Sequence, residues 1–486
     1  MNKKTLIYNI FLLISSGFLV KALGLFNKIF LTRILGQEGI SLYILAYPTI
    51  MLFTNLSSFG LKESISKLVS DQLILDKPLK SIIIKSIKIS IFIILALSII
   101  LLISSPVIAK SLGEESLKIL FLTSIPLIVF VSLGGILKGY LSGIKRLDII
   151  AKSQLYEQII RIIFSLALGL YFIRFSILHA VFFTLISLSI GEGFSFFYLV
   201  YEISKITKFN KPYIKNDNDY KRILNISFPI FSSRIISSIS LFLEPLIYSL
   251  ALKKIGLSSK IINESFGIFN GYALSLLTLL TFVSMAIFQG IFPNLTDSIF
   301  KKDYQKSNEI INLTLGINFF FSSFLMIIIY FYSKELLIIL FDNSSGYLMS
   351  KNISVLFVLY YLLITLNGIL VISKNTFSLV KISIMSSIIR LLLIYILSIN
   401  PDINIFGLGY ALLISLIFNF ILSYEEIKKN LNFKLDYKLF ISLGMLYFLG
   451  FLTVGFLNSN LYLSIFLLGL LYLLFLLKSY HKYYAK

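Results

Sequence analysis

The sequence predicts an all-α polytopic membrane protein with about 14 transmembrane helices. Hydrophobic residues make up 57% of the 486-residue chain and charged residues only 14%, against about 45–50% and about 25% in soluble globular proteins. Apolar runs of roughly 20 residues, the length that crosses a bilayer, recur along the whole chain. A water-soluble fold is excluded because so few polar side chains could not cover its surface.

The apolar runs are separated by loops too short to hold a soluble domain. The first run follows Lys3 and Lys4 and lacks a small-residue cleavage site, so we interpret it as an uncleaved span rather than a signal peptide. In chain order the expected spans are 6–30, 40–60, 82–108, 117–141, 153–174, 177–201, 223–250, 265–292, 309–332, 353–372, 381–398, 405–423, 437–457 and 461–478.

The distribution of Lys and Arg among the loops predicts how the chain is oriented in the membrane. With the N-terminus in the cytoplasm, the inside segments hold about 27 Lys and Arg residues and the outside segments about 8, as the positive-inside rule requires. An even number of spans then places both termini in the cytoplasm, and the expected location is the bacterial cytoplasmic (inner) membrane. The rule also accounts for the net charge of +21, so no nucleic-acid partner is expected.

Several functional classes are disfavoured by what the sequence lacks. There is no cysteine and there are two histidines, so neither a thiolate nor a histidine-rich metal site is expected, and no cofactor is expected. No G-x-x-x-x-G-K-[ST], G-x-S-x-G or H-E-x-x-H motif occurs. The chain is therefore not expected to be an ATP-driven pump or an enzyme.

Two stretches resemble each other and suggest an internal repeat. Gly135-Ile136-Leu137 precedes a basic loop and Ile159–Ile162, whereas Gly368-Ile369-Leu370 precedes Lys374 and Ile388–Leu391. The alternative is a chance match of sequence rich in Ile and Leu. Units six spans apart keep the same orientation in the membrane. We therefore expect two lobes around a central cavity and two appended helices, with domains at 1–205, 206–430 and 431–486.

Charged residues inside the apolar spans are the candidate functional residues, because a charge at mid-bilayer is costly unless it faces water or a partner. Lys21 and Lys28 are seven residues apart, close to two helical turns, so both project from one face of the first span. A cationic stripe of this kind suits an anionic ligand. For Lys28 the alternative is an ammonium group that snorkels to the membrane surface.

Glu157 and Arg161 are spaced i, i+4 in the fifth span and are expected to pair, although Arg161 could still donate to a ligand. Arg390 occupies the matching position of the repeat without a carboxylate four residues earlier, which makes it the stronger candidate for binding an anion. Glu192 could pair with a cation of the protein or bind a coupling ion.

The seventh span combines charge with proline. Arg234 and Glu244 lie in it together with Pro229 and Pro245, and a proline inside a span permits a kink. A kinked, charged span suits a moving element. The alternative is a buried ion pair with another helix.

Short glycine-containing motifs lie near the ends of several spans. They are Gly17-Phe18-Leu19-Val20-Lys21-Ala22-Leu23-Gly24, Leu35-Gly36-Gln37-Glu38-Gly39-Ile40-Ser41-Leu42-Tyr43, Ala46-Tyr47-Pro48, Gly60-Leu61-Lys62-Glu63-Ser64-Ile65-Ser66-Lys67-Leu68-Val69, Phe292-Pro293-Asn294-Leu295-Thr296 and Gly407-Leu408-Gly409-Tyr410-Ala411. In order and spacing they resemble the stage V sporulation protein B-like branch of the multidrug/oligosaccharidyl-lipid/polysaccharide (MOP) exporter superfamily.

The resemblance implies two six-helix lobes around a central cavity that opens alternately to each side. Fourteen spans resemble the lipid II and polysaccharide-precursor flippases, whereas drug-exporting relatives typically have twelve. The resemblance further implies a cationic cavity for the substrate pyrophosphate and a groove for the polyprenyl tail along the two extra helices. Lys21 stands where this branch commonly has arginine, and lysine lacks the bidentate fork that suits phosphate.

We therefore expect a flippase that carries undecaprenyl-pyrophosphate-linked saccharide, either a lipid II-type peptidoglycan precursor or a polysaccharide repeat unit. Its expected partners are this lipid, the bilayer and, as an open possibility, a coupling cation. The alternatives are a cation-coupled multidrug exporter and a membrane scaffold for envelope or spore assembly that transports nothing. The expected substrate-binding cations are Lys21, Lys28, Arg161, Arg234 and Arg390, and the expected ion-coupling or ion-pairing carboxylates are Glu157, Glu192 and Glu244.

Overall fold

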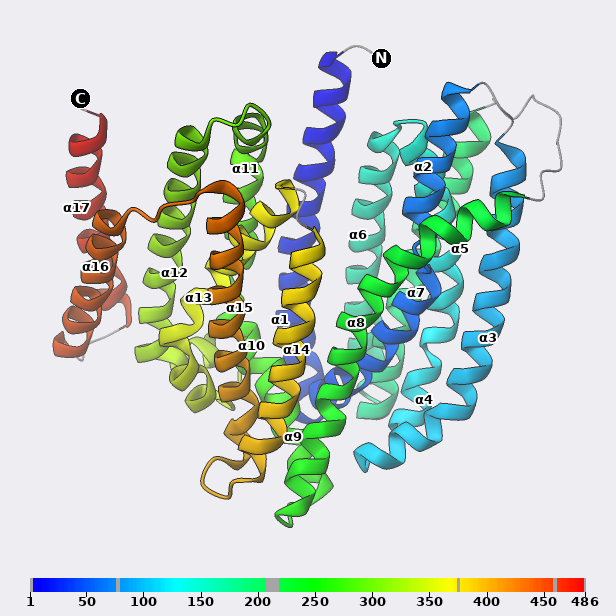
Figure 1. The fold of residues 1–486 in the computed structure, drawn as a ribbon. Helices are drawn as coiled ribbons and strands as arrows, with labels where there is room; N and C mark the ends of the chain where they lie inside the picture. The colour runs from blue at the N-terminus through cyan, green and yellow to red at the C-terminus, as the bar shows by residue number, and fades with distance from the viewer. Residues whose placement is uncertain (1–2, 76–78, 207–217, 374–375, 458–460, 485–486) are drawn as a thin grey trace. The chain divides into compact units, whose positions relative to one another are not determined.

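The computed structural model describes residues 3–75, 79–206, 218–373, 376–457 and 461–484. These residues are predominantly helical and contain no β-strand, which confirms the all-α prediction (Figure 1). The chain forms two compact units, Met1–Gly267 and Ile268–Lys486, called unit 1 and unit 2 below. Several lysines counted as cytoplasmic lie outside the described residues: Lys77, Lys208, Lys211, Lys215, Lys374 and Lys486.

Unit 1 is a bundle of long helices joined by short connections. Its helices are α1 (Lys3–Ser58), α2 (Leu61–Ile74), α3 (Lys80–Leu112), α4 (Leu117–Leu122), α5 (Ser124–Gly143), α6 (Leu147–Phe172), α7 (Ile177–Lys205), α8 (Asn218–Lys254) and α9 (Ser259–Ile268), the last of which ends one residue beyond the unit.

A single glycine divides α1. Gly36 has φ 64° and ψ −172°, a backbone conformation that is essentially restricted to glycine. The predicted spans 6–30 and 40–60 lie on its two sides. Figure 1 shows the chain descending along the first part of α1 and rising again through α2, so this glycine provides the reversal between the first two spans.

Two other glycines allow α2 to pack closely on α5. A Cβ at Gly139 would lie 2.6 Å from the Lys62 carbonyl oxygen, and one at Gly143 would lie 2.7 Å from Val69 Cβ. The four-residue spacing puts both glycines on one face of α5, a pattern that permits close helix contact in membranes. Leu61 and Ile65 of α2 are fully buried in the apolar cluster at this contact.

Substituting Gly143 with alanine is therefore expected to lower the free energy of unfolding by about 1–3 kcal/mol, the usual cost of overpacking. The matched control is Gly134→Ala on the same helix, because a Cβ there meets no atom within 4 Å. Unfolding in mixed micelles, followed by circular dichroism, measures the difference. Equal stability of the two variants would contradict close packing of α2 on α5.

Helix α8 continues through both prolines of the predicted seventh span. Its course in Figure 1 bends between its two ends, as proline within a helix permits. Asn55 of α1 donates to Ser238 of α8 over 3.0 Å, so a polar contact holds α8 to α1 within the apolar bundle.

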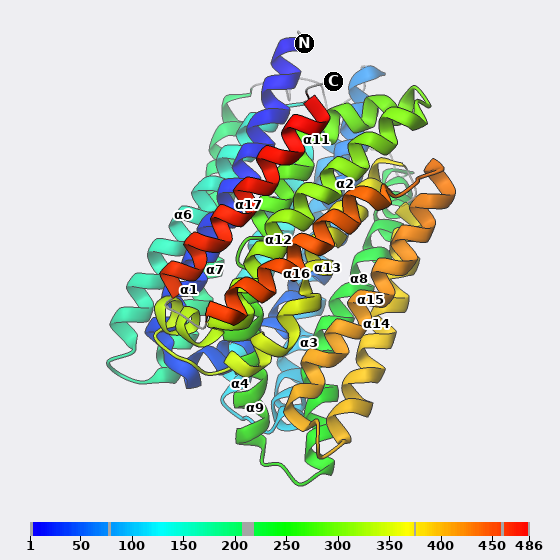
Figure 2. The ribbon, with the colours of Figure 1, turned by 90° about the vertical axis from the view of Figure 1, so that its left-hand side faces the viewer.

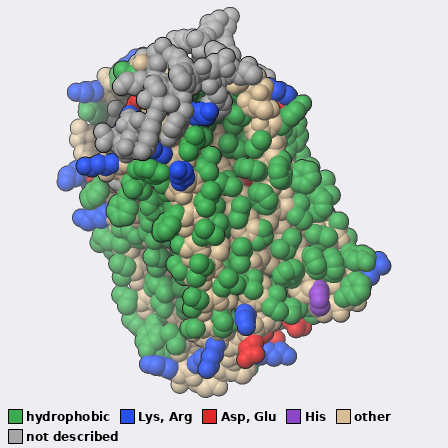
Figure 3. Space-filling view, turned by 90° about the vertical axis from the view of Figure 1, so that its right-hand side faces the viewer, with side chains coloured by type: hydrophobic (Ala, Val, Ile, Leu, Met, Phe, Trp, Pro, Cys, Tyr) green, Lys and Arg blue, Asp and Glu red, His purple; other side chains and the backbone are tan. Residues whose placement is uncertain are grey.

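The outward faces of the helices are strongly apolar. On α3, Phe92 is 74% exposed and Ile103 is 71% exposed. Figure 3 shows a broad hydrophobic belt on one face, with Lys and Arg side chains gathered toward its two ends. Such exposure suits hydrocarbon rather than water, and the chain is a multi-pass membrane protein.

Unit 2 begins within a broken span, whose first part is α9, and continues with six long helices. Its elements are η1 (Phe269–Ala273), α10 (Leu274–Leu277), α11 (Thr281–Phe300), α12 (Tyr304–Phe341), α13 (Tyr347–Ile372), α14 (Thr376–Ile399), η2 (Asn404–Phe406), α15 (Gly407–Leu431), α16 (Tyr437–Leu457) and α17 (Leu461–Tyr484).

The broken span is the predicted span 265–292. It contains a π-helical turn at Phe269–Ala273 and bends by 46° between Leu277 and Thr281. The Tyr361 hydroxyl of α13 donates to the Leu277 carbonyl over 2.8 Å. That bond supplies a partner to a carbonyl that the break removes from the helix, as a non-aqueous environment requires.

The last two helices pack on α12. Leu446 of α16, Leu468 of α17 and Ile327 of α12 are buried in one apolar cluster, and the Tyr472 hydroxyl lies 2.9 Å from Ser323 Oγ. Figure 2 shows α12, α16 and α17 side by side. The two appended spans predicted at 437–457 and 461–478 are thus helices.

The described residues contain 11 helices long and apolar enough to cross a membrane, or 12 if the bent pair counts as one span. The expected number was about 14. The numbers differ because the first two predicted spans, on the two sides of Gly36, are counted as one, and because the described apolar part of α17, Leu461–Phe475, is too short to count as a span.

The first compact unit extends to Gly267, beyond the expected lobe boundary at 205/206. The reason is that α8 packs against α1, α2 and α3 of unit 1. The three-part division at 1–205, 206–430 and 431–486 stays a prediction about the functional lobes.

Candidate functional site

Three charged side chains meet inside the helix bundle of unit 1. The Lys138 ammonium of α5 lies 3.3 Å from a Glu192 oxygen of α7 and 3.6 Å from a Glu157 oxygen of α6. The three side chains are only 13–15% exposed, and each lies in a helix apolar enough to span a membrane. Ionised groups at such positions persist because they neutralise one another.

Arg161 extends this cluster along α6. Its guanidinium lies 3.6 Å from Glu157 and donates to Gln158. Thus the structure contains the ion pair that the i, i+4 spacing predicts. On α7, a Cβ at Gly191 would lie 2.8 Å from the Glu157 carbonyl oxygen, so this glycine allows α7 to approach α6 where Glu157 and Glu192 meet Lys138.

A second ion pair joins α8 to α2. The Arg234 guanidinium lies 2.7 Å from Glu63, and their side chains are 46% and 34% exposed. Lys62, next to Glu63, interacts electrostatically with this pair and also with Lys138 and Glu192. The two groups of charges are therefore neighbours in unit 1, and they are together called the polar track below.

Because the Arg234–Glu63 pair is half-exposed, we expect it to contribute little to stability. Arg234→Gln and Glu63→Gln are each expected to lower the free energy of unfolding by less than about 1 kcal/mol, as for exposed ion pairs. Chemical unfolding of the two single variants and the double variant measures the coupling. A coupling well above that value would mean that the pair is shielded from solvent.

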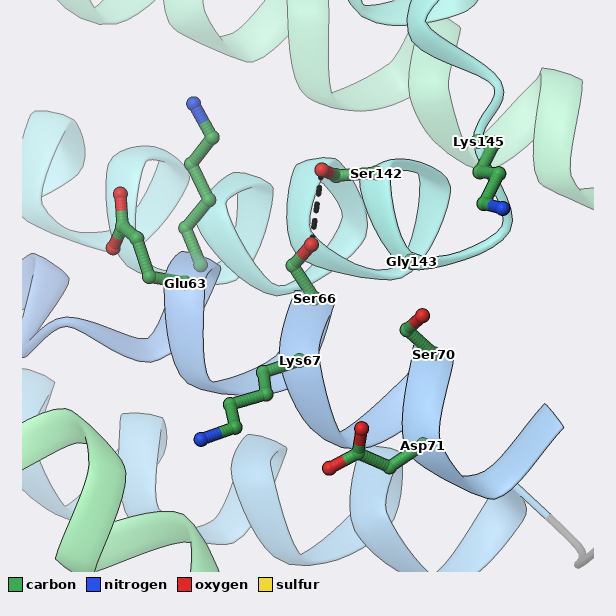
Figure 4. Close-up of a pocket in the computed structure, with 9 residues that line it drawn as sticks. Glu63, Ser66, Lys67, Ser70, Asp71, Ser142, Gly143 and Lys145 are labelled. Atoms are coloured by element: carbon green, nitrogen blue, oxygen red, sulfur yellow. Dashed lines mark hydrogen bonds between the residues drawn. The ribbon is translucent and has the colours of Figure 1, made fainter. Parts of the chain in front are cut away.

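An open cavity of about 390 Å³ extends along α2, beside the C-terminal end of α5. In Figure 4 the Ser66 hydroxyl of α2 reaches Ser142 of α5, over 2.9 Å, and Lys145 lies on the turn that follows α5. The lysines of the cavity, Lys62, Lys67 and Lys145, are among the residues expected on the cytoplasmic side. Its lining residues are Lys62, Glu63, Ser66, Lys67, Ser70, Asp71, Ser142, Gly143 and Lys145.

The predicted lysine stripe lies on α1, beside α6. Lys21 is exposed and Lys28 is half-buried. Between them, Asn27 accepts a 2.7 Å hydrogen bond from Ser165 of α6, and Gly24 lies near Gln158. The stripe and Arg161 therefore belong to neighbouring helices, while the binding role of Lys21 and Lys28 remains a prediction.

Two predicted site residues remain, Glu244 and Arg390. Glu244 is buried on α8, with 4% exposure. Arg390 lies half-buried on α14 in unit 2, where it interacts electrostatically with Tyr360. Their roles as carboxylate partner and anion-binding cation remain predictions.

Sequence reasoning missed Lys138, the residue that connects Glu157 with Glu192. The available signal was its position inside the predicted span 117–141, three residues before the span ends. So close to a basic loop it resembles a topology-determining lysine, and only the packing of α5 against α7 and α6 reveals its partners.

Comparison with known proteins places the chain in a family. Residues 6–299 match the polysaccharide biosynthesis protein family. The chain belongs to this family. It is 25% identical to stage V sporulation protein B of Bacillus subtilis over 463 residues, which cover 93% of this chain and 89% of that protein. It is 23% identical to sporulation protein YkvU of the same organism, over 63% of this chain and 70% of that protein.

Solved structures agree on the fold. The lipid II flippase MurJ, in an inward closed conformation, matches 97% of this chain and 99% of its own with a TM-score of 0.75 and 18% identity. An inward-facing multidrug resistance MATE transporter of the MOP superfamily matches 85% of this chain and 95% of its own, with a TM-score of 0.61 and 14% identity. The chain thus has the fold of these transporters, and together with the family match and the likeness to stage V sporulation protein B this confirms the resemblance found in the sequence.

Proposed function

We propose that this protein is a flippase that moves undecaprenyl-pyrophosphate-linked saccharide from the cytoplasmic to the outer leaflet of the bacterial cytoplasmic membrane. Both termini would face the cytoplasm. The observation that carries the proposal is the polar track of unit 1, because it places several ionised groups inside membrane-spanning helices. The family match and the MurJ-like fold support the same class of substrate.

A lipid-linked saccharide poses a specific physical problem for transport. Its charged, hydrated headgroup cannot cross hydrocarbon unaided, whereas its polyprenyl tail can stay in the lipid. A track of charged side chains lowers the barrier for the headgroup only, since polar groups are costly in an apolar medium without partners. No covalent step is required, and two conformations that open to opposite sides are sufficient.

The charges of unit 1 favour an anionic cargo over a cationic drug. Glu157 and Glu192 are both engaged by Lys138, and Glu157 also by Arg161. Carboxylates neutralised in this way do not form the acidic cavity that a drug cation would need. We propose that the cargo pyrophosphate is attracted by cations of the spans, namely Lys21, Lys28, Arg161, Arg234 and Arg390.

The experiment compares two cargoes in proteoliposomes that contain the purified full chain. A fluorescent lipid-linked saccharide is followed by its accessibility to a membrane-impermeant quencher, and ethidium uptake is followed in parallel. We expect protein-dependent movement of the lipid and none of ethidium. Ethidium transport without movement of the lipid would reverse the assignment in favour of a multidrug exporter, and movement of neither cargo would favour a scaffold.

A further inference from the structure

The cavity between α2 and α5 has the composition of an anion-binding site. Three lysines line it, Lys62, Lys67 and Lys145, together with the carboxylates Glu63 and Asp71. Glu63 is neutralised by Arg234 at 2.7 Å, so three lysines face the single remaining carboxylate. The volume of about 390 Å³ lies in the usual range of small-molecule sites, about 300–1,000 Å³.

We infer that this cavity binds a phosphate-bearing headgroup, with Lys67 and Lys145 as its charged ligands and the serines of α2 and α5 as neutral donors. Lysine is a strong point-charge partner for phosphate. The Ser66 and Ser142 hydroxyls form a pair across the two helices, and Ser70 lies one turn further along α2 (Figure 4). Hydroxyls beside ammonium groups are a donor set that suits phosphate oxygens.

The backbone at Lys145 fixes where this lysine lies. Lys145 has φ 63°, in the left-handed region where glycine or asparagine is normally favoured over a long side chain. Helices commonly end on a residue in this conformation, so it places Lys145 on the tight turn that follows α5. The turn after α5 thus carries a lysine where a glycine would be less strained, and this lysine lines the cavity.

The wall of the cavity is held in place by close helix packing. Gly143 is itself a lining residue, and a Cβ there would lie 2.9 Å from the Ser66 carbonyl oxygen. The backbones of α2 and α5 are therefore pressed together directly beside the serine pair. The donors on both helices are fixed before a ligand arrives, which lowers the entropic cost of binding.

Lys62 is shared by the cavity and the polar track. That lysine lines the cavity and interacts electrostatically with Lys138 and Glu192 deeper in the bundle. If the proposed function holds, on which this step rests, the cavity is where the headgroup diphosphate first leaves the cytoplasmic surface. The charges around Lys138 then lie next along its path.

The test is binding of inorganic pyrophosphate to the purified full chain in detergent, measured by calorimetry for wild type, Lys67→Gln/Lys145→Asn and Lys152→Gln. Asparagine tolerates the left-handed conformation, so Lys145→Asn removes charge without adding strain. Lys152 is an exposed lysine of α6 outside the lining. We expect the dissociation constant to rise at least tenfold in the double variant and less than twofold in Lys152→Gln.

A second arm identifies the source of the phosphate. The same titration is repeated in nanodiscs with and without phosphatidic acid. Weaker pyrophosphate binding in the presence of phosphatidic acid would assign the site to lipid headgroups. Unchanged binding would assign it to soluble phosphates or to the headgroup of a translocated lipid, and both outcomes support a phosphate site.

The inference is overturned if pyrophosphate does not bind, or if the double variant and Lys152→Gln weaken binding equally. Neither result depends on transport, so each is distinguishable from failure of the flippase proposal. Binding through Lys67 and Lys145 without any flipping would keep the site and reject the transport function. Flipping without binding of pyrophosphate through Lys67 and Lys145 would keep the transport function and reject the site.

Discussion

Replacing Lys138 with methionine is expected to lower the free energy of unfolding by about 3–5 kcal/mol, the cost of breaking a buried ion pair by removing one partner. Methionine keeps most of the side-chain volume, so the loss of stability measures the removal of the charge rather than a change in packing. Without the ammonium group, Glu192 and Glu157 face each other across α6 and α7 in an apolar bundle. Reversible unfolding in mixed micelles, followed by circular dichroism, measures the change.

The control for this variant is Lys152→Met, a substitution of an exposed lysine on α6, which is expected to change stability by less than about 0.5 kcal/mol. The double variant Lys138→Met/Glu192→Gln should recover part of the loss, because it removes one of the stranded carboxylates. If Lys138→Met were as stable as Lys152→Met, the ion pairs of unit 1 would have no structural role.

The double substitution Lys21→Ala/Arg390→Ala is expected to slow the initial rate of lipid flipping at least tenfold, which corresponds to about 1.4 kcal/mol of barrier. Both cations lie in membrane-spanning helices, and neither side chain is fully buried. Without these cations the anionic headgroup would have to cross the membrane interior with fewer positive partners, where an unpaired charge is most costly. Flipping in proteoliposomes at equal protein incorporation measures the effect.

The matched control is Lys118→Ala/Lys428→Ala, which removes one exposed lysine from each unit. It is expected to flip lipid at the wild-type rate. Lys21→Arg should flip at least as fast as wild type, because the guanidinium fork suits phosphate better than an ammonium group does. If the Lys21→Ala/Arg390→Ala variant flipped lipid at the wild-type rate, neither residue would belong to the binding site.

The fold class follows from the sequence because each span is a local property. A run of apolar residues long enough to cross a bilayer must form a helix to satisfy its own backbone, and the predicted spans fall on helices throughout the described residues. The division of α1 at Gly36 agrees with the prediction of separate spans 6–30 and 40–60. The break between Leu277 and Thr281 was harder to anticipate, because the Leu277 carbonyl accepts from Tyr361 of a distant helix.

The candidate site shows the same division between local and distant interactions. The pair of Glu157 and Arg161 was predictable, since residues four apart on one helix are neighbours. The partner of Glu192 was not, because Lys138 reaches it from another helix and periodicity within one helix carries no information about that contact. For Arg234 the alternative of an ion pair with another helix agrees with the structure, although the pair is half-exposed and its partner Glu63 could not be named for the same reason.

The most direct test of the central claim is movement of an undecaprenyl-pyrophosphate-linked saccharide across sealed vesicles that contain the wild-type protein. The headgroup is labelled with a fluorophore, and its arrival in the opposite leaflet is measured with and without an imposed membrane potential. We expect an initial rate that rises with the amount of protein and exceeds that of protein-free vesicles. A rate equal to that of protein-free vesicles under both conditions would contradict the account.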